Sequence, residues 1–187
     1  MFKLNKKGFT LIELMVTITI VAILMMMTYA PYQYYSNKAK VRITARDISQ
    51  VLTETRNLAV HGLDKGTGNL SLGVYFDSTD SLKNKVQVFS FPHNYEYTQI
   101  LPDESDPNVN LIKTVKLKAG VEIDRVGGQN NGFFVFESIT GEGTYSYFQS
   151  SKQNFSDVNI DIEFSYKDSA NIKNKITYIT KTNISDY

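Results

Sequence analysis

The chain has 187 residues, of which 20 are basic and 19 acidic, and it contains no cysteine. A formal net charge of +1 is too small to attract nucleic acid over a whole surface. Without cysteine the chain forms no disulfide, and metal sites built on cysteine pairs are excluded. The length allows one domain beyond a membrane segment.

The N-terminal part combines a basic leader with a long apolar run. The leader ends at Gly8 and carries three basic side chains: Lys3, Lys6 and Lys7. The 22 residues from Phe9 to Ala30 then contain one charged side chain, Glu13. As a helix this run spans roughly 33 Å, about the hydrocarbon thickness of a bilayer. The pattern predicts a membrane helix, in which an unpartnered acid costs on the order of 2 to 3.5 kcal/mol.

This arrangement resembles the class III signal of type IV prepilins, which type IV pilins, competence pilins and type II secretion pseudopilins share. The residues that carry the resemblance are the basic leader, Gly8, the run Phe-Thr-Leu-Ile-Glu over 9–13, and the apolar segment after it. The resemblance implies that prepilin peptidase cuts after Gly8 and methylates the new terminal amine of Phe9. It also implies that Glu13 faces the cationic terminal amine of a neighbouring pilin subunit during filament assembly.

Two other interpretations of the same segment fit less well. A secretory signal has an apolar core of about 7 to 15 residues and a small-x-small cleavage site. Here the run is longer, and its only candidate end, Tyr29-Ala30, is followed by Pro31. A plain signal anchor allows this length but gives no reason for Glu13.

The positive leader predicts the topology. By the positive-inside rule, Met1 to Gly8 lie in the cytoplasm and the C-terminal bulk lies outside the cytoplasmic membrane. Cleavage after Gly8 would leave 17 basic and 19 acidic side chains. Many Gram-negative pilins close a C-terminal loop with a disulfide, which this chain cannot form, so the resemblance favours another subclass.

The helical pattern continues beyond the apolar run. Pro31 removes a helical hydrogen bond and predicts a kink, close to a group of tyrosines that suits a membrane interface. Small and apolar residues then recur at spacings of 3 and 4, which predicts an amphipathic helix that ends at His61, before Gly62. The residues of this stripe are Val41, Ala45, Ile48, Leu52, Thr55 and Ala59.

The period changes after Gly62, where short alternating or aromatic runs are separated by turn residues. The alternation is cleanest at Val158 to Tyr166, which predicts a half-buried strand. Several such runs predict an antiparallel sheet or small sandwich, so the fold class is α+β, with a long N-terminal helix packed on a β head. The expected strands are Leu70–Phe76, Lys85–Phe91, Tyr95–Leu101, Ile112–Leu117, Val121–Ile123, Phe133–Ser138, Thr144–Gln149, Val158–Tyr166 and Lys175–Thr182.

This layout gives four expected segments. They are a leader over 1–8, a transmembrane and assembly helix over 9–30, an amphipathic stem over 31–61 and a β head over 62–187. A stem followed by a wholly β head resembles the H-type minor pseudopilins and FimT-like minor pilins more than the major pilins. Whether the subunit is major or minor stays open.

No residues of the head form a pattern typical of a catalytic or metal site. His61 and His93 have no metal-ligand partner at helical spacing, and each is expected to be a surface or capping side chain. The acidic loop Pro102 to Asn108 could offer oxygens to calcium, but it lacks EF-hand spacing and suits ordinary turns. Asp77, Asp80 and Ser81 are expected in a hairpin loop.

The glycine-rich run Gly127 to Gly132 precedes a strand, whereas phosphate cradles need a helix N-terminus. It is expected to be a flexible tip. No cofactor, metal or enzymatic activity is therefore expected.

DNA is a further candidate partner. Aromatic residues are numerous, and lysines are interleaved near the C-terminus, as in binders of single-stranded DNA: Lys167, Lys173, Lys175 and Lys181. Acidic residues among these lysines leave no basic block.

The favoured interpretation is a structural subunit of a pilus or of a secretion or competence pseudopilus. The alternatives are a DNA-uptake receptor at a pilus tip and a membrane-anchored enzyme.

Overall fold

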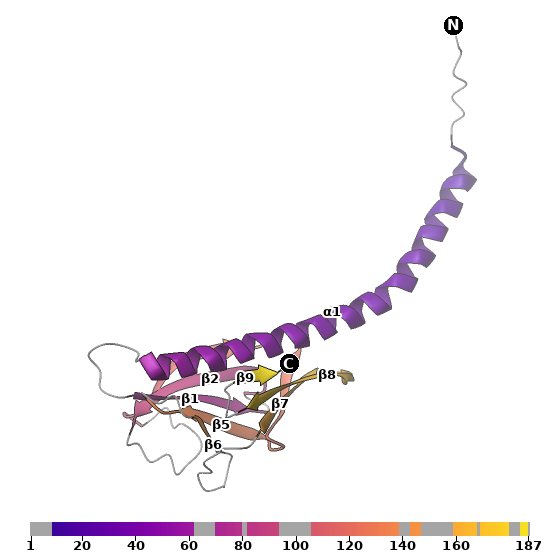
Figure 1. Cartoon of the computed structure of the whole chain (residues 1–187). Coiled ribbons are helices and arrows are strands. Elements are labelled where there is room, and N and C mark those ends of the chain that lie inside the picture. The colour runs from indigo at the N-terminus through magenta and orange to yellow at the C-terminus, as the bar shows by residue number, and fades with distance from the viewer. Residues whose placement is uncertain are drawn as a thin grey trace. The chain divides into compact units, whose positions relative to one another are not determined.

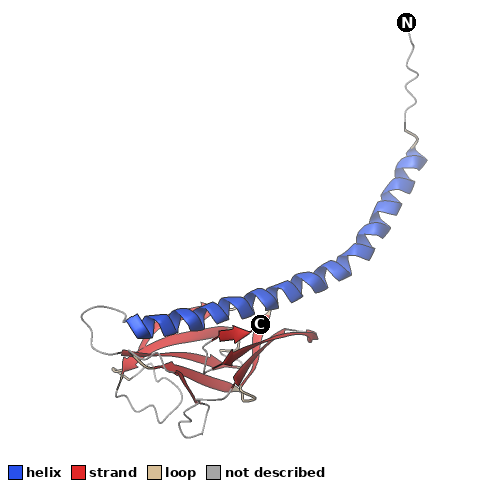
Figure 2. Ribbon diagram, in the orientation of Figure 1, coloured by secondary structure: helices blue, strands red, loops and turns tan. Residues whose placement is uncertain are grey.

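The computed structural model describes residues 9–61, 70–79, 82–93, 106–138, 143–146, 159–167, 169–179 and 184–186. One helix, α1 (Leu11–His61), precedes strands that form two antiparallel sheets, as Figures 1 and 2 show. The architecture is α+β, which confirms the predicted fold class. The chain forms two compact units, Met1–Asn37 and Lys38–Tyr187.

The helix α1 has two chemically different parts. Before Val41 none of its residues is buried, and the helix continues through Pro31 without interruption. From Val41 onward one face is buried, as the spacing of 3 and 4 predicts. The buried residues are Val41, Thr44, Ala45, Ile48, Ser49, Val51, Leu52, Thr55 and Ala59. This part of α1 belongs to the second unit, so the division at 61/62 into stem and head stays a prediction.

The first sheet has five strands in the order β3-β2-β1-β5-β6. Its neighbouring strands pair antiparallel, and β1 lies at the centre between β2 and β5. The strands are β1 (Leu70–Asp77), β2 (Lys85–Pro92), β3 (Asn110–Lys116), β5 (Asn131–Phe136) and β6 (Gly143–Ser146).

The second sheet has four strands in the order β4-β7-β8-β9, again antiparallel throughout. Two register shifts interrupt it, one in β4 at Asp124 and one between β7 and β8 after Ser165. The strands are β4 (Val121–Val126), β7 (Asn159–Tyr166), β8 (Ser169–Ile179) and β9 (Ile184–Asp186).

One core joins the buried face of α1 to both sheets. In β7 the alternate residues Ile160, Ile162 and Phe164 are buried, while the residues between them are partly exposed. This period of two leaves one face for the core and one for solvent. The second sheet is therefore half-buried, as the sequence predicts for Val158 to Tyr166.

The first sheet is buried on both faces at its centre. Phe134 and Phe136 of β5 belong to the core with α1. Phe133 and Val135 belong to a second buried cluster on the opposite face of the sheet. The second cluster contains Tyr75, Phe89, Phe91, Val109, Phe133 and Val135. A strand buried on both faces has a continuous apolar run, such as Phe133 to Phe136.

Eight of the nine described strands fall on predicted runs, with ends that differ by a few residues. The largest difference is in β8, which begins at Ser169 whereas the predicted strand begins at Lys175. The short strand β9 was not predicted. The predicted strand Tyr95–Leu101 lies outside the described residues.

Candidate functional site

The start of α1 is fixed by a reciprocal pair of hydrogen bonds between Thr10 and Glu13. The Thr10 backbone N–H and hydroxyl donate to Glu13 Oε2 at 2.9 and 2.8 Å. In return the Glu13 backbone N–H donates to Thr10 Oγ1 at 3.3 Å. This is a capping box, in which the N-cap side chain and the carboxylate three residues later satisfy each other's backbone donors.

The capping box gives Glu13 a local structural role that the sequence interpretation missed. The spacing Thr-x-x-Glu before an apolar run was the available signal. Within the chain the carboxylate already accepts two hydrogen bonds. These hydrogen bonds reduce the free-energy cost of placing it in an apolar surrounding. Phe9 is 77% exposed at the same end of the helix, while Gly8 lies outside the described residues. Cleavage after Gly8, methylation of Phe9 and pairing of Glu13 with another chain stay predictions.

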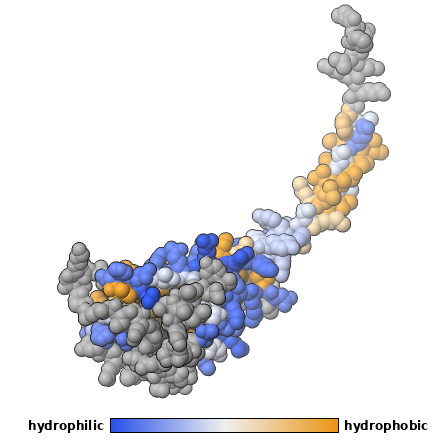
Figure 3. Space-filling model, in the orientation of Figure 1, coloured by the Kyte–Doolittle hydropathy of each residue, from blue (hydrophilic) through white to orange (hydrophobic). Residues whose placement is uncertain are grey.

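The first part of α1 after the capping box has an apolar surface, as Figure 3 shows. Leu14, Ile18 and Met25 are 55, 61 and 67% exposed. The Thr17 and Thr19 hydroxyls donate to the backbone carbonyls of Leu14 and Met15, both at 2.8 Å, so these polar groups are satisfied inside the helix. Among the described residues, α1 is the one helix long and apolar enough to cross a membrane.

Tyrosines gather at the end of the apolar run. Tyr29, Tyr32 and Tyr35 are 65, 70 and 66% exposed, and Tyr34 packs edge-on against Tyr35 with ring centroids 5.6 Å apart. Exposed rings at this depth suit a membrane interface. The kink at Pro31 stays a prediction.

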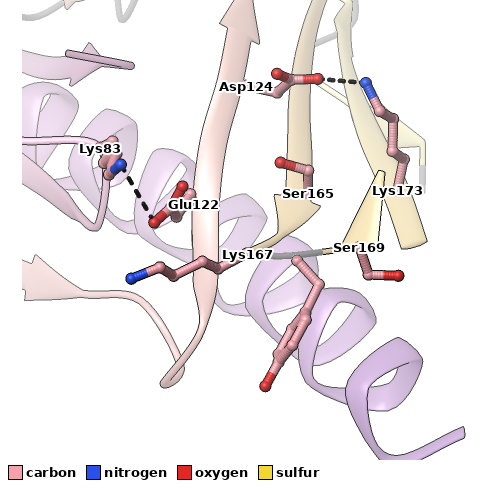
Figure 4. A pocket seen from close by; sticks show the side chains of 8 residues that line it. Lys83, Glu122, Asp124, Ser165, Lys167, Ser169 and Lys173 are labelled. Atoms are coloured by element: carbon pink, nitrogen blue, oxygen red, sulfur yellow. Dashed lines mark hydrogen bonds and ion pairs between the residues drawn. The ribbon is translucent and has the colours of Figure 1, made fainter. Parts of the chain in front are cut away.

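An open hollow of about 600 Å³ lies on the face of the second sheet that points away from the core. Figure 4 shows side chains from β4, β7 and β8 around it. Its lining consists of Lys83, Glu122, Asp124, Ser165, Tyr166, Lys167, Ser169 and Lys173. Both acids of the lining are ion-paired, since Lys83 Nζ lies 3.4 Å from Glu122 and Lys173 Nζ lies 2.6 Å from Asp124. Each acid of the lining is therefore held by a lysine side chain at the surface of the sheet.

The C-terminal lysines proposed for DNA binding include two that form ion pairs. Lys173 bonds to Asp124, and the Lys175 ammonium donates to Asp161 at 2.8 Å. Each of these hydrogen bonds raises the pKa of the lysine. The bonds from Lys175 and from the Thr177 hydroxyl lower the pKa of Asp161. Lys181 lies outside the described residues, and DNA binding stays a prediction.

The two histidines are both exposed. His61 Nδ1 lies 2.8 Å from the Asn57 carbonyl oxygen in the last turn of α1, which confirms the expected surface or capping role. His93 lies in the turn after β2. Within the part of the chain that the structure describes, no three His, Asp or Glu side chains lie together as potential metal ligands.

The acidic segments form turns where they are described. Asp106 Oδ1 accepts hydrogen bonds from the backbone and side-chain nitrogens of Asn108, at 2.8 and 3.0 Å. Asp77 Oδ1 accepts the Thr79 backbone N–H at 2.8 Å, between the paired strands β1 and β2. These are side-chain turns of the expected kind. Asp80, Ser81 and Pro102 to Ser105 lie outside the described residues.

The glycine-rich run begins with a tight turn, and its expected role as a flexible tip stays a prediction. Val126 and Gln129 exchange backbone hydrogen bonds of 2.9 and 3.0 Å around Gly127 and Gly128. Both glycines have positive φ, 58° and 79°, as the favoured two-residue hairpin turn requires. The Gly127 N–H also donates to the Asp161 carbonyl at 2.8 Å, which ties the turn to β7.

Comparison with known proteins matches one family to the N-terminal segment. Residues 3–29 match the family described as the prokaryotic N-terminal methylation motif. No curated protein and no solved structure gives a significant match to the chain. The matched segment contains the three lysines of the leader, the capping box and most of the apolar run. Residues 3–29 are therefore a type IV pilin-like prepilin signal.

Proposed function

We propose that this type IV pilin-like precursor is a structural subunit of a pilus or of a secretion or competence pseudopilus. In this proposal prepilin peptidase cuts after Gly8, Phe9 is methylated, and α1 packs with the helices of other pilin subunits. The observation that carries the proposal is the prepilin signal over residues 3–29. A helix that is exposed and apolar over its first part supports it.

The chemistry of α1 supports the proposed transfer of the subunit from the membrane into a filament. In the bilayer its apolar surface contacts lipid, and in a filament the same surface would contact the helices of neighbours. The apolar contribution of the two surroundings is therefore similar. The difference in free energy between the membrane and the filament comes from Glu13. Its carboxylate is stabilised more by a cationic amine than by Thr10 alone. The proposed partner is the terminal amine of Phe9 on the neighbouring subunit.

The head favours a minor pilin or pseudopilin over a major pilin. Its two sheets, of five and four strands, share one core with the second half of α1. The major pilins are expected to have one four-stranded sheet instead. We infer that the head contributes contacts between proteins rather than catalysis. The head would lie outside the cytoplasmic membrane before assembly, and in the pilus or pseudopilus afterwards.

Mass spectrometry of the chain from cells with an active prepilin peptidase tests the processing step. The wild-type chain is expected at the mass of residues 9–187 with one added methyl group. The Gly8→Ala chain is expected at full precursor mass, and Asn5→Ala, in the same leader, is the matched control that is still cut. Cleavage of Gly8→Ala would refute the processing step.

Filament assembly is tested by shearing filaments from cells that express the wild-type or Glu13→Ala chain. The Glu13→Ala chain is expected to be cut normally but to be depleted from the sheared fraction. Equal amounts of the two chains there would contradict the role proposed for Glu13.

A further inference from the structure

Tyr166, the last residue of β7, lies against the turn between β3 and β4. Gly120 in this turn has a φ of 84°, and a Cβ there would come within 2.7 to 2.8 Å of the Tyr166 ring. The Lys167 backbone N–H donates to the Gly120 carbonyl at 2.7 Å, which holds the strand end against the turn. The absence of a side chain at Gly120 therefore lets the Tyr166 ring settle onto the backbone.

Two side chains of α1 reach this same region. The Lys40 ammonium lies 5.4 Å from the centroid of the Tyr166 ring, a cation–π contact. About two helical turns later, Asp47 Oδ2 lies 3.4 Å from Nζ of Lys118, which is two residues before Gly120. These contacts connect the ends of one stretch of α1 to the β3–β4 turn. That stretch includes the first buried residue of the helix, Val41.

Between these two contacts lies a buried polar group that is not satisfied. Thr44 is 1% exposed, and among the described residues its hydroxyl is one of two buried side-chain groups without a hydrogen-bond partner. Thr55, on the same helix face, is 3% exposed, and its hydroxyl donates to the Val51 carbonyl at 2.7 Å. A buried hydroxyl without a partner has lost its hydrogen bonds to water, so its burial destabilises the packed arrangement of the helix. The helix is thus weakened at Thr44 but not at Thr55.

We propose that residues 38–47, the latched segment, separate from the head as a local unit, and that Tyr166 is the latch that holds them closed. In the closed state this segment is packed as described above. The contact of Lys40 with the Tyr166 ring and the packing of that ring on Gly120 favour the closed state, while the buried Thr44 hydroxyl favours opening. Opening frees about ten residues of helix, which lengthens the unattached part of α1 by roughly 15 Å. The rest of the core, from Ile48 to Ala59, stays packed. This property belongs to the second compact unit, Lys38–Tyr187, and holds whether or not the chain assembles into filaments.

Thiol accessibility in the full-length chain in detergent micelles tests the proposal. The chain has no cysteine, so one introduced thiol gives an unambiguous signal. Ala45→Cys places it in the latched segment, where Ala45 is 0% exposed, and Ala59→Cys places it at the far end of the same face, where Ala59 is 2% exposed. The labelling rate of a buried thiol by a soluble maleimide follows the population of the open state. The Ala45→Cys thiol is expected to react at least tenfold faster than the Ala59→Cys thiol.

Variants of the latch then shift this ratio in opposite directions. Tyr166→Leu is expected to raise the rate at Ala45→Cys roughly tenfold and to leave Ala59→Cys unchanged. Tyr166→Phe keeps the ring and is the matched control, with no change. Thr44→Val removes the unsatisfied hydroxyl and is expected to slow the rate at Ala45→Cys roughly tenfold. Thr55→Val, which removes a satisfied hydroxyl, should not slow it.

Two results would overturn the proposal. One is equal labelling of the two thiols in the wild-type background, which would mean that the helix opens only with the whole head. The other is an unchanged rate at Ala45→Cys in Tyr166→Leu. If Tyr166→Leu raises both labelling rates together, the labelling rates are measured again in Lys40→Met, which removes the cation–π contact, with Lys40→Arg as its control. A roughly threefold rise confined to Ala45→Cys supports the latch, and no rise there refutes it.

Discussion

The Phe133 ring lies across Gly73, so that a Cβ at Gly73 would be 2.3 Å from the ring carbon Cζ of Phe133. The two residues come from neighbouring strands, since Gly73 pairs with Val135 and Tyr75 with Phe133. The ring thus covers the place where β1 has no side chain. It also contacts Phe91, with centroids 6.0 Å apart, in the second buried cluster. A glycine in the centre of a strand is explained here by the aromatic side chain that packs over it.

Gly73→Ala is expected to destabilise the head by about 1 to 3 kcal/mol, because the added methyl group displaces the Phe133 ring in a packed cluster. Urea unfolding of the full chain in micelles measures this change. In the double variant Gly73→Ala with Phe133→Leu, the clash disappears, so the two effects should be less than additive. Strict additivity would show that Phe133 is not the reason for the glycine.

The Asp161 carboxylate predicts an acid dependence of stability. Hydrogen bonds from Lys175 and Thr177 lower its pKa in the folded head. A carboxyl group with a lowered pKa stabilises the fold above its unfolded pKa near 4 and loses this contribution as the pH falls through the lower, folded pKa. Because the side chain is 38% exposed, the contribution is small, under about 1 kcal/mol.

Asp161→Asn is therefore expected to reduce stability at pH 6 and to have less effect at pH 3, when measured by urea unfolding. Thr177→Val removes one of the two donors and should give part of the same change. An equal loss at both pH values would show that the ionised carboxylate does not contribute.

Tyr178 predicts the opposite dependence at high pH. Burial raises the pKa of its phenol to about 12, because the ionised form is poorly solvated in the core. The neutral phenol thus favours the fold below the unfolded pKa near 10, and the fold loses stability as the pH rises from 10 towards 12. The loss is on the order of 2 kcal/mol by pH 12. Tyr178→Phe, compared with the exposed control Tyr32→Phe, should remove part of the alkaline unfolding seen by circular dichroism. Identical alkaline midpoints for the two variants would contradict this assignment.

Local patterns predicted the elements of this fold well, because each reflects one buried face. The alternation in β7 and the 3 and 4 spacing in α1 depend on neighbours close in sequence, so both could be read without a structure. The burial of β5 on both faces is consistent with the run Phe133 to Phe136, but the existence of a second cluster depends on how five strands are ordered. That order is a tertiary property.

The charge pairs show the same limit. Lys173 and Asp124 are 49 residues apart in the chain, and they meet across β7, which lies between β4 and β8 in the second sheet. Sequence alone presents Lys173 as part of a lysine-containing tail, and only the pairing of strands identifies its partner. The unsatisfied hydroxyl of Thr44 is equally invisible in the sequence, where the predicted stripe includes Thr55 but not Thr44. By contrast, the capping box of Thr10 and Glu13 is local and could have been predicted from spacing.

The two roles of Glu13, capping the helix and pairing with a terminal amine, are separated by matched substitutions at Thr10 and Glu13. Glutamine serves in a capping box but carries no charge, so Glu13→Gln keeps the cap and removes the ion pair. Thr10→Val removes the cap hydroxyl and keeps the carboxylate, while Thr10→Ser keeps both. We expect Glu13→Gln to be as depleted from sheared filaments as Glu13→Ala, and Thr10→Ser to match wild type. Thr10→Val should lower helix stability near the N-terminus by about 1 kcal/mol and reduce filament incorporation less than Glu13→Gln. If Glu13→Gln enters filaments as well as wild type while Thr10→Val does not, Glu13 acts as a cap and the charge pair is unnecessary.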